Sequence, residues 1–352
     1  MTNEKILFIC GSINQTKMMH KISMHLDDFE CYFTPYYSDG FTKFLSKTKF
    51  LDFSILGGQF RKKTLKYLTE HNLKVDFEGK QRKYDLVYTC SDLIIPKNIK
   101  ESNIILVQEG MTDPENLMYH LVKKLKLPRY LASTSTTGLS DAYDKFCVAS
   151  EGYKEFFIKK GATPPKIEIT GIPNFDNCKE YYNNNFPFKN YVLFATSDSR
   201  ETFKYENRKK YIEFAKKIAG DKQLIFKLHP NEKFERAIQE INKYAPGSLI
   251  YTEGNTEHMI ANCDTLITRY SSVVYVGLAL GKKVYSEFNV EELKKLMPIQ
   301  NDGLSAFNIS EIGRDLLTNQ SKAKIYKLNK ELKLSTRLFK KYKSSRNYQK
   351  AE

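Results

Sequence analysis

Several common sequence signals are missing from this chain of 352 residues. No apolar run approaches the roughly 20 residues needed to span a bilayer, and the opening Met-Thr-Asn-Glu-Lys is too short and too acidic for a signal peptide. The six cysteines form no Cys-x-x-Cys pair and no metal-ligand spacing. We therefore expect a cytoplasmic protein, soluble or peripheral to a membrane, whose cysteines are buried and reduced.

Two short motifs that often reveal a ligand are missing as well. The pattern Gly-x-Gly-x-x-Gly does not occur, which argues against a bound dinucleotide. No Asp-x-Asp sequence is present to hold a metal ion. Tryptophan is also absent, although this excludes no class of protein. We therefore expect neither a tightly bound cofactor nor a metal.

The composition that remains is that of a folded globular protein. Apolar residues make up 41% of the chain, and 23 Phe with 23 Tyr supply large side chains for a core. A chain of 352 residues exceeds the usual size of a single core. This length predicts two domains of roughly 150 residues each.

The net charge of +15 is concentrated at the carboxyl end. Residues 321–352 contain eleven Lys or Arg and two Glu, and therefore carry +9 of the total. A basic amphipathic tail of this kind can lie on an anionic membrane, but it can equally pack its apolar stripe on the protein body. Nucleic acid is a less favoured partner, because no recognition motif accompanies the basic residues. The stripe consists of Ile325, Leu328, Leu332, Leu338, Phe339 and Tyr342.

Strand-like and helix-like segments alternate through the first half of the chain, which predicts a parallel sheet. The polar segment 181–190, which contains Pro187, indicates a linker after a first domain of residues 1–180. The expected strands are 5–10, 29–33, 84–89, 104–108, 145–149 and 166–170, with a further apolar stretch at 51–60 and helices near 18–26, 63–70 and 116–125.

The second half repeats this plan over residues 191–320, without a repeat at the level of residues. The fold class that follows is α/β, with two Rossmann-like domains facing a central cleft. The expected strands are 191–195, 223–228, 248–251, 264–268 and 283–288, and a helix is expected over 207–220.

Chemically useful residues follow predicted strands in both halves. Glu109 and Gly110 come directly after an apolar strand of the first half, and Lys227, His229 and Pro230 end a buried strand of the second. Open α/β sheets bind their ligands beyond the carboxyl ends of their strands. Each set is therefore a candidate for a site between the two domains, although Glu109 could also be a helix cap and His229 an ordinary loop residue.

Two further turns add polar groups. Ser271 and Ser272 follow a third strand, where they can cap the next helix and leave its amides facing a phosphate. Asn14, Gln15 and Thr16 follow the first strand, where an acceptor or a sugar could lie, although helix capping explains Thr16 equally well.

Taken in order along the chain, Glu109-Gly110, Lys227-x-His229-Pro230 and Ser271-Ser272 resemble nucleotide-sugar glycosyltransferases of the GT-B fold. They look most like the bacterial sialyl-, polysialyl- and Kdo-transferases, which use CMP-activated sugars. The resemblance implies that Glu109 is the general base that deprotonates the acceptor. It also implies that His229 supports the leaving CMP phosphate and that the serine pair binds that phosphate.

The resemblance further implies an inverting reaction that requires no metal, because a base and stabilisation of the leaving group suffice. Lys227 and Thr196 would then belong to the donor site. Arg200 and Arg269 are candidates for binding the carboxylate of a sialic acid or Kdo donor. The acceptor would be a bacterial surface glycan or glycolipid, such as capsule or lipopolysaccharide, reached at the inner face of the cytoplasmic membrane.

Two other families share parts of the pattern. The chain from about residue 104 to residue 300 is similar to UDP-N-acetylglucosamine 2-epimerases, although it has Thr196-Ser-Asp-Ser-Arg-Glu201 where they carry a His-Arg-Arg-Glu-Asn motif. The segment Ile267-Thr-Arg-Tyr-Ser-Ser272 resembles the serine motif of CDP-glycerol glycerophosphotransferases. An epimerase, another CDP- or UDP-dependent transferase, and a non-catalytic sugar-nucleotide binding protein therefore remain alternatives.

Overall fold

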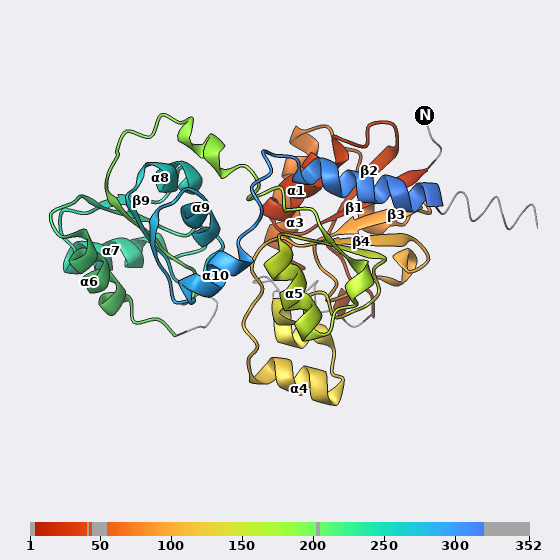
Figure 1. Ribbon diagram of the computed structural model, residues 1–352, viewed down its shortest axis with the longest axis horizontal. Helices are drawn as coiled ribbons and strands as arrows, with labels where there is room; N and C mark the ends of the chain where they lie inside the picture. Colours follow the sequence, from red (N-terminus) through yellow and green to blue (C-terminus); the bar gives the residue numbers. More distant parts are fainter. Residues whose placement is uncertain (1–3, 41, 44–54, 202–204, 320–352) are drawn as a thin grey trace, which may run out of the picture.

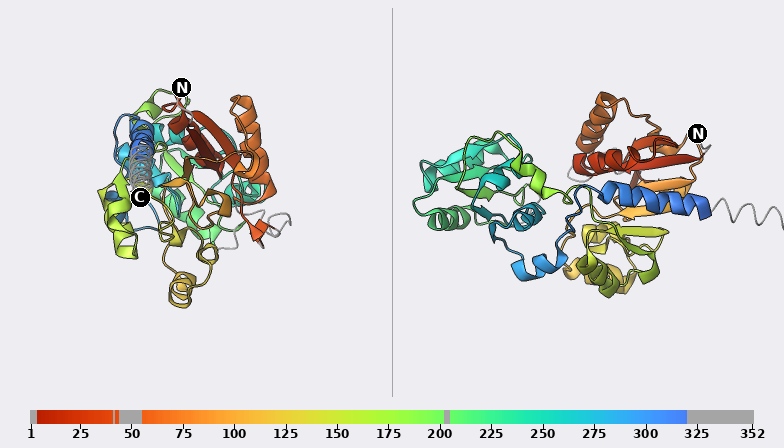
Figure 2. Two further views of the ribbon diagram at one scale, coloured as in Figure 1. Left: turned by 90° about the vertical axis from the view of Figure 1, so that its right-hand side faces the viewer. Right: turned by 45° about the horizontal axis from the view of Figure 1, so that its top comes forward.

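The computed structural model describes residues 4–40, 42–43, 55–201 and 205–319. The basic tail at 321–352, for which we considered membrane contact and packing on the protein body, lies outside these ranges. Residues 51–54 of the apolar stretch expected at 51–60 also lie outside them. Within the described part the chain forms two halves, each built on its own parallel sheet (Figure 1). The two halves lie side by side along the long axis of the molecule (Figure 2).

The first sheet has six parallel strands in the order β2-β1-β3-β4-β5-β6. Its central strands are apolar on both faces and almost completely buried, as expected where helices cover a parallel sheet on both sides. The chain moves outward from β1 to β2 and then resumes on the other side of β1 with β3, so the sheet has a switch point there. The strands are β1 (Lys5–Cys10), β2 (Glu30–Pro35), β3 (Leu86–Thr89), β4 (Asn103–Val107), β5 (Lys145–Val148) and β6 (Ile167–Ile169).

Helices follow most of these strands. The first helix begins at Ile13, earlier than the expected residue 18, because Ser12 caps it. The Ser12 side chain accepts from the Gln15 amide, and the Gln15 side chain accepts in return from the Ser12 amide. The helices of this half are α1 (Ile13–Ser23), α3 (Gly58–Glu70), α4 (Leu117–Leu125) and α5 (Glu151–Lys160), with 3₁₀ turns η2 (Phe77–Gly79), η3 (Lys97–Ile99), η4 (Arg129–Thr136) and η5 (Pro164–Lys166).

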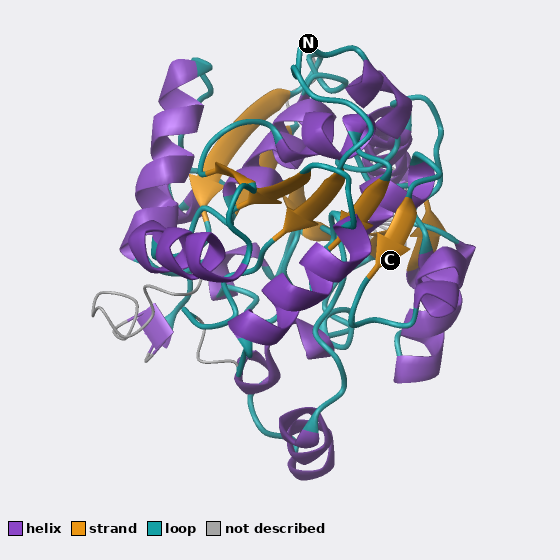
Figure 3. Ribbon diagram, turned by 90° about the vertical axis from the view of Figure 1, so that its left-hand side faces the viewer, coloured by secondary structure: helices purple, strands orange, loops and turns teal. Residues whose placement is uncertain are grey.

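The second sheet has five parallel strands in the order β11-β10-β7-β8-β9, with its switch point between β7 and β10. Figure 3 shows helices packed around the strands. The strands are β7 (Val192–Ala195), β8 (Leu224–Lys227), β9 (Leu249–Tyr251), β10 (Thr265–Ile267) and β11 (Lys283–Tyr285). The helices are α6 (Arg208–Ala219), α7 (Phe234–Tyr244), α8 (Thr256–Asn262), α9 (Val274–Ala279) and α10 (Val290–Leu296), and η6 (Cys178–Tyr182) precedes the sheet.

Buried aromatic side chains join the two halves. The hydroxyls of Tyr153, on α5, and Tyr275, on α9, lie 2.7 Å apart, and the ring of Phe175 packs edge-on against Tyr275. All three residues belong to one continuous apolar cluster that includes strands of both sheets. The halves therefore share a core in addition to the chain connections.

The chain returns to the first half after α10. Residues 305–319 form a helix that lies along the first sheet (Figure 1). Its residue Arg314 forms a two-pronged ion pair with Asp28, at 2.6 and 2.7 Å, and the Tyr88 hydroxyl donates to the carbonyl of Ile309 at 3.4 Å. The sequence predicted that the second domain extends to residue 320, but the helix of residues 305–319 packs on the first half.

The six cysteines are all free thiols, and five of them are buried. Burial raises the pKa of Cys10 and of Cys147 to about 12. Among the described residues, no helix combines the length and the apolar character needed to cross a membrane.

Candidate active site

Glu109 follows β4 and is held by the turn that follows β1. Its carboxylate accepts hydrogen bonds from the Ser12 hydroxyl at 2.9 Å and from Nε2 of Gln15 at 2.5 Å. Desolvation raises the pKa of Glu109, while the bonds from Gln15 and Ser12 act in the opposite direction. The result is an oriented carboxyl group with a raised pKa, which is the property of a general base.

The residue after Glu109 touches the opposite half. A methyl group placed on Gly110 would lie 3.5 Å from Cβ of Ser272 and 3.7 Å from the ring of Phe175. The carboxyl edge of β4 and the turn after β10 therefore face each other across the boundary between the halves. The structure thus brings together two of the three strand ends that the sequence singled out.

The serine pair does not cap a helix as expected. The next helix, α9, begins at Val274, and its cap position is Val273, which makes no side-chain cap bond. The amides of Val274 and Tyr275 already donate to the carbonyls of Ser271 and Ser272, at 3.2 and 3.1 Å. The first amides of α9 are therefore occupied. The Ser271 hydroxyl accepts from the Val273 amide at 3.5 Å, and both serine hydroxyls can still donate to a phosphate.

His229 lies in the turn after β8, where its ring is oriented by its neighbours. Nδ1 accepts from the amide of Asn231 at 3.3 Å and lies 3.7 Å from the carboxylate of Asp198. The side chain is 36% exposed, so it remains accessible to a ligand. With Nδ1 as the acceptor, the neutral ring carries its proton on Nε2, which can donate to an anion.

A buried glutamate supports this turn. The Glu232 carboxylate accepts from the His229 amide at 3.0 Å, and it also binds the Thr196 hydroxyl and the Arg208 guanidinium. The Thr196 hydroxyl in turn accepts from the same His229 amide at 3.0 Å. Thr196, expected in the donor site, therefore holds the histidine turn in place.

Lys227 and Pro230 differ in their surroundings. Nζ of Lys227 donates to the backbone carbonyls of Leu228 at 2.8 Å and Thr252 at 3.1 Å, and the side chain is buried. Desolvation lowers the pKa of this ammonium group. Lys227 therefore ties β8 to the segment after β9, whereas Pro230 is exposed beside His229.

Both arginines proposed for a sugar carboxylate already have carboxylate partners. Arg200 binds Glu240 through two hydrogen bonds at 2.8 and 2.9 Å. Arg269 binds Glu206 at 2.9 Å and lies over the ring of Tyr211. A donor carboxylate would have to displace these pairs, so neither cation is set up to receive one in this arrangement.

The two residues of α1 that were expected on the acceptor side, Asn14 and Gln15, also differ in their exposure to solvent. Asn14 is exposed in the first turn of the helix, while Gln15 is buried and bonded to Glu109. Ser12 was not among the expected site residues, although the spacing Ser12-x-x-Gln15 is a capping-box signal that could have placed both side chains at the start of a helix.

Glu232 and Arg208 were also missed. Glu232 comes only three residues after His229, but the sequence gives no sign that it is buried. Nη1 of Arg208 and the hydroxyl of Thr268, at the end of β10, are buried without a hydrogen-bond partner among the described residues. The same part of the chain contains no cluster of His, Cys, Asp or Glu that could hold a metal ion.

Comparison with known proteins identifies the class of fold. No protein-family model matches the chain, and no curated protein matches its sequence. The chain is similar to a solved UDP-N-acetylglucosamine 2-epimerase, with a TM-score of 0.54 at 14% identity over 92% of this chain and 97% of that one. The two sheets and this similarity confirm the predicted α/β fold of GT-B type.

Two other solved structures have the same overall fold. One is UDP-GlcNAc 2-epimerase from Neisseria meningitidis bound to UDP-GlcNAc, with a TM-score of 0.54 at 13% identity, covering 89% of this chain and 100% of that one. The other is the wall teichoic acid polymerase TagF, with a TM-score of 0.52 at 12% identity, covering 90% of this chain and 89% of that one.

Proposed function

We propose that this protein is a nucleotide-sugar-dependent glycosyltransferase in which Glu109 is the general base. The observation that supports this most directly is the geometry of the β4 end. An oriented carboxyl group with a raised pKa lies next to Gly110, which contacts the serine turn of the other half. A base on one side and phosphate-binding groups on the other are what transfer from a nucleotide sugar requires.

The proposed reaction proceeds by direct displacement. The Glu109 carboxylate takes the proton of the acceptor hydroxyl as the acceptor oxygen forms a bond to the anomeric carbon. The bond between that carbon and the phosphate oxygen breaks, and its electron pair leaves with the nucleotide. His229 donates a hydrogen bond from Nε2 to the departing phosphate, and the hydroxyls of Ser271 and Ser272 bind the same group.

The donor that we favour is a CMP-activated sugar of the sialic acid or Kdo type, used without a metal. The order of Glu109, His229 and the serine pair along the chain supports this choice. A UDP-sugar 2-epimerase or a CDP-glycerol-type transferase is the alternative, since solved structures of both types share the fold. Arg200 and Arg269 would have to exchange their glutamate partners for the carboxylate of a sialic acid or Kdo donor.

The acceptor that we propose is a glycan or a lipid-linked glycan of a bacterial surface, such as capsule or lipopolysaccharide. Transfer would take place in the cytoplasm at the inner membrane face. This location fits a nucleotide-sugar donor and a membrane-borne acceptor. The tail at 321–352 is one candidate for membrane attachment.

Thermal-shift measurements with CMP, CDP, UDP and GDP test the donor class. We expect selective stabilisation by CMP that is lost in His229→Ala. Glu109→Gln provides the matched variant, because it should keep the nucleotide response while losing transfer. Preference for UDP would remove the CMP assignment, and a sugar product formed from donor alone, without acceptor, would identify an epimerase.

A further inference from the structure

Helix α4 stands away from the rest of the first half (Figures 1 and 2). Large apolar side chains on it and just after it are exposed to solvent, with Leu117 at 76% and Leu125 at 60%. Such a concentration of exposed apolar groups is rare on a protein surface without a partner. The α4 face, as we name it, consists of Leu117, Met118, Leu121, Leu125, Leu127 and Leu131.

The helical geometry explains why these groups are exposed. Successive residues turn by about 100° around a helix, so Leu117, Leu121 and Leu125 form a row along one side. Tyr119 and Val122 lie on the adjoining side and are the buried residues of α4. The apolar arc of α4 is therefore wider than the part that the protein body covers, and half of it is left facing outward.

The segment that presents this face is firmly attached to the body. Asp92 is fully buried and accepts from Arg129 at 3.0 Å, and from the amides of Gly138 at 3.1 Å and Ser140 at 3.0 Å. Nζ of Lys160 donates to the carbonyl of Ser135, next to the ring of Tyr119. The buried ion pair between Asp92 and Arg129 therefore fixes the segment that carries α4 to the protein body.

Basic residues predominate around the α4 face. Residues 117–131 contain four Lys or Arg and no Asp or Glu, although Asp113 and Glu115 come shortly before them. Lys124 and Lys126 are exposed beside the leucines, whereas Lys123 lies on the far side of the helix, where its Nζ donates to the carbonyl of Lys160 at 3.0 Å. Exposed apolar groups next to lysines are the pattern of a helix that lies in the interface of an anionic bilayer.

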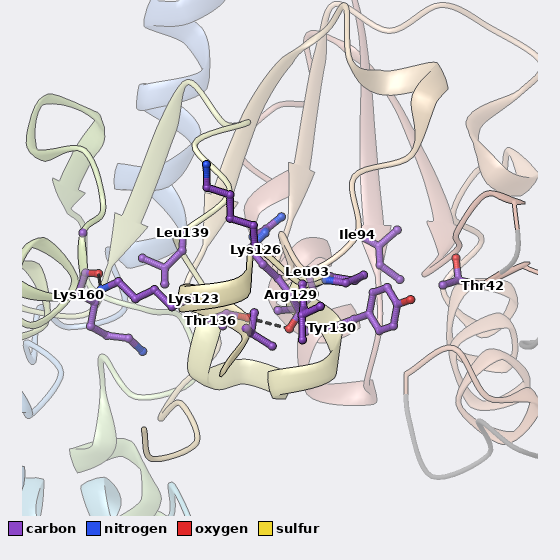
Figure 4. A pocket seen from close by; sticks show the side chains of 14 residues that line it. Thr42, Leu93, Ile94, Lys123, Lys126, Arg129, Tyr130, Thr136, Leu139 and Lys160 are labelled. Atoms are coloured by element: carbon purple, nitrogen blue, oxygen red, sulfur yellow. Dashed lines mark hydrogen bonds between the residues drawn. The ribbon is translucent and has the colours of Figure 1, made fainter. Parts of the chain in front are cut away.

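A hollow behind the helix adds a second apolar surface. A cavity of about 690 Å³ lies between α4, η4 and the segment after β3. Figure 4 shows Leu93 close to Lys126 and Arg129, with Ile94 and Tyr130 next to them. Apolar walls with basic groups suit a lipid, whose chain is apolar and whose head group is anionic.

We propose that the α4 face docks on an anionic lipid bilayer. Its leucines enter the head-group region and its lysines bind the anionic head groups. This contact is separate from any made by the tail at 321–352, and it does not depend on nucleotide binding. A second copy of the chain fits less well, because the lysines around the leucines would repel each other across a symmetric contact.

The absence of tryptophan makes a direct test possible. Leu125→Trp introduces a single fluorescent reporter on the α4 face. Met24→Trp introduces a matched one at the C-cap of α1, where the side chain is 67% exposed, and α1 lies well away from α4 (Figure 1). With phosphatidylcholine vesicles containing phosphatidylglycerol, we expect a blue shift and quenching by brominated lipids for the first reporter only. Pure phosphatidylcholine should give a much smaller response.

Two sets of variants then separate the contributions. Replacing Leu117, Leu121 and Leu125 together by serine should weaken vesicle binding by at least about tenfold, since each leucine loses its burial in lipid. Replacing Lys124 and Lys126 by glutamine should remove the preference for phosphatidylglycerol. Circular dichroism serves as the folding control, because all five substituted side chains are exposed.

Three results would overturn the proposal. Vesicle binding without a response at position 125 would place the contact elsewhere, as on the basic tail. Equal responses at positions 24 and 125 would show that no particular face is used. A blue shift at position 125 that grows with protein concentration in the absence of vesicles would identify a second copy of the chain as the occupant.

Discussion

Glu232 links the stability of the second half to the position of His229, and Glu232→Gln is the substitution that probes this link. The carboxylate is buried and binds the Arg208 guanidinium, the Thr196 hydroxyl and the His229 amide. Glutamine preserves the size of the side chain and one acceptor oxygen but removes the charge. The substitution therefore tests the ionic contact with little change in packing.

The expected loss follows from these contacts. Removing one partner of a buried ion pair costs about 3–5 kcal/mol, because the remaining charge loses its compensation. Two contacts reduce this figure here. Glu206 lies 2.6 Å from Nε of Arg208, and the Thr196 hydroxyl still accepts from the His229 amide. We therefore expect Glu232→Gln to lower the free energy of unfolding by about 2–3 kcal/mol.

Denaturant unfolding followed by circular dichroism measures this change, which should move the midpoint and leave the slope unaltered. Glu240→Gln is the matched control, because it removes the carboxylate of the more exposed Arg200 pair. That control should lose only about 1 kcal/mol. The stabilisation by nucleotide should also fall in Glu232→Gln, since the His229 turn loses support, and persist in Glu240→Gln.

The stability result stands independently of the proposed activity. If Glu232→Gln unfolds at the same denaturant concentration as the unmodified protein or as Glu240→Gln, the buried carboxylate does not hold the turn. The same conclusion follows if both variants lose the nucleotide response equally. A loss of stability with a full nucleotide response would separate the two roles and leave His229 positioned by other contacts.

Three further substitutions test the remaining features. Gly313→Ala should destabilise the protein by about 1–2 kcal/mol in denaturant unfolding, because the added methyl collides with the Tyr88 hydroxyl. This loss outweighs the preference of about 1 kcal/mol that alanine has over glycine in a helix. Adding Tyr88→Phe should relieve part of the loss. Hydrogen bonds from Arg314 lower the pKa of Asp28, so the stability from this pair is present above the unfolded value of about 3.9 and is lost as the pH falls through the lowered folded value. Arg314→Ala should therefore cost about 0.5 kcal/mol more at pH 7 than in strong acid, after allowance for screening, as measured by unfolding at both pH values. Lys227→Met should lower the free energy of unfolding by about 1–3 kcal/mol, because it leaves two backbone carbonyls without their donor, while the thermal shift with nucleotide persists.

The strands could be predicted from the sequence because each is a short, almost wholly apolar run flanked by polar turns. Runs such as Ile6–Ile9 and Leu224–Phe226 are buried on both faces, which is the pattern of a parallel sheet. The last helix could not be assigned in the same way. Its apolar residues show that it packs somewhere, but only the contacts of Arg314 and Tyr88 show that it packs on the first sheet.

The sequence could predict which polar residues lie at the ends of strands, but it could not predict what each of these side chains contacts. Glu109 follows a strand of the first sheet and Ser272 follows a strand of the second, and the carboxyl ends of both strands face the boundary between the halves. Lys227, Arg200 and Arg269 carry the charge that a phosphate or carboxylate site needs. Yet each is bonded to a group distant in sequence, which is the Thr252 carbonyl for Lys227 and a glutamate for each arginine. Charge is visible in a sequence, whereas the partner that neutralises it depends on tertiary contacts.

The exposure of the α4 face also could not be predicted from the sequence. The spacing of Leu117, Leu121 and Leu125 predicts a helix with an apolar side, and such a side is normally expected to face the core. The structure covers the neighbouring side, with Tyr119 and Val122, and leaves this one in solvent. An apolar row that the core does not use reduces solubility unless something else covers it. The lysines beside it narrow the choice to a surface that is itself anionic and apolar, which a lipid bilayer is and most protein surfaces are not.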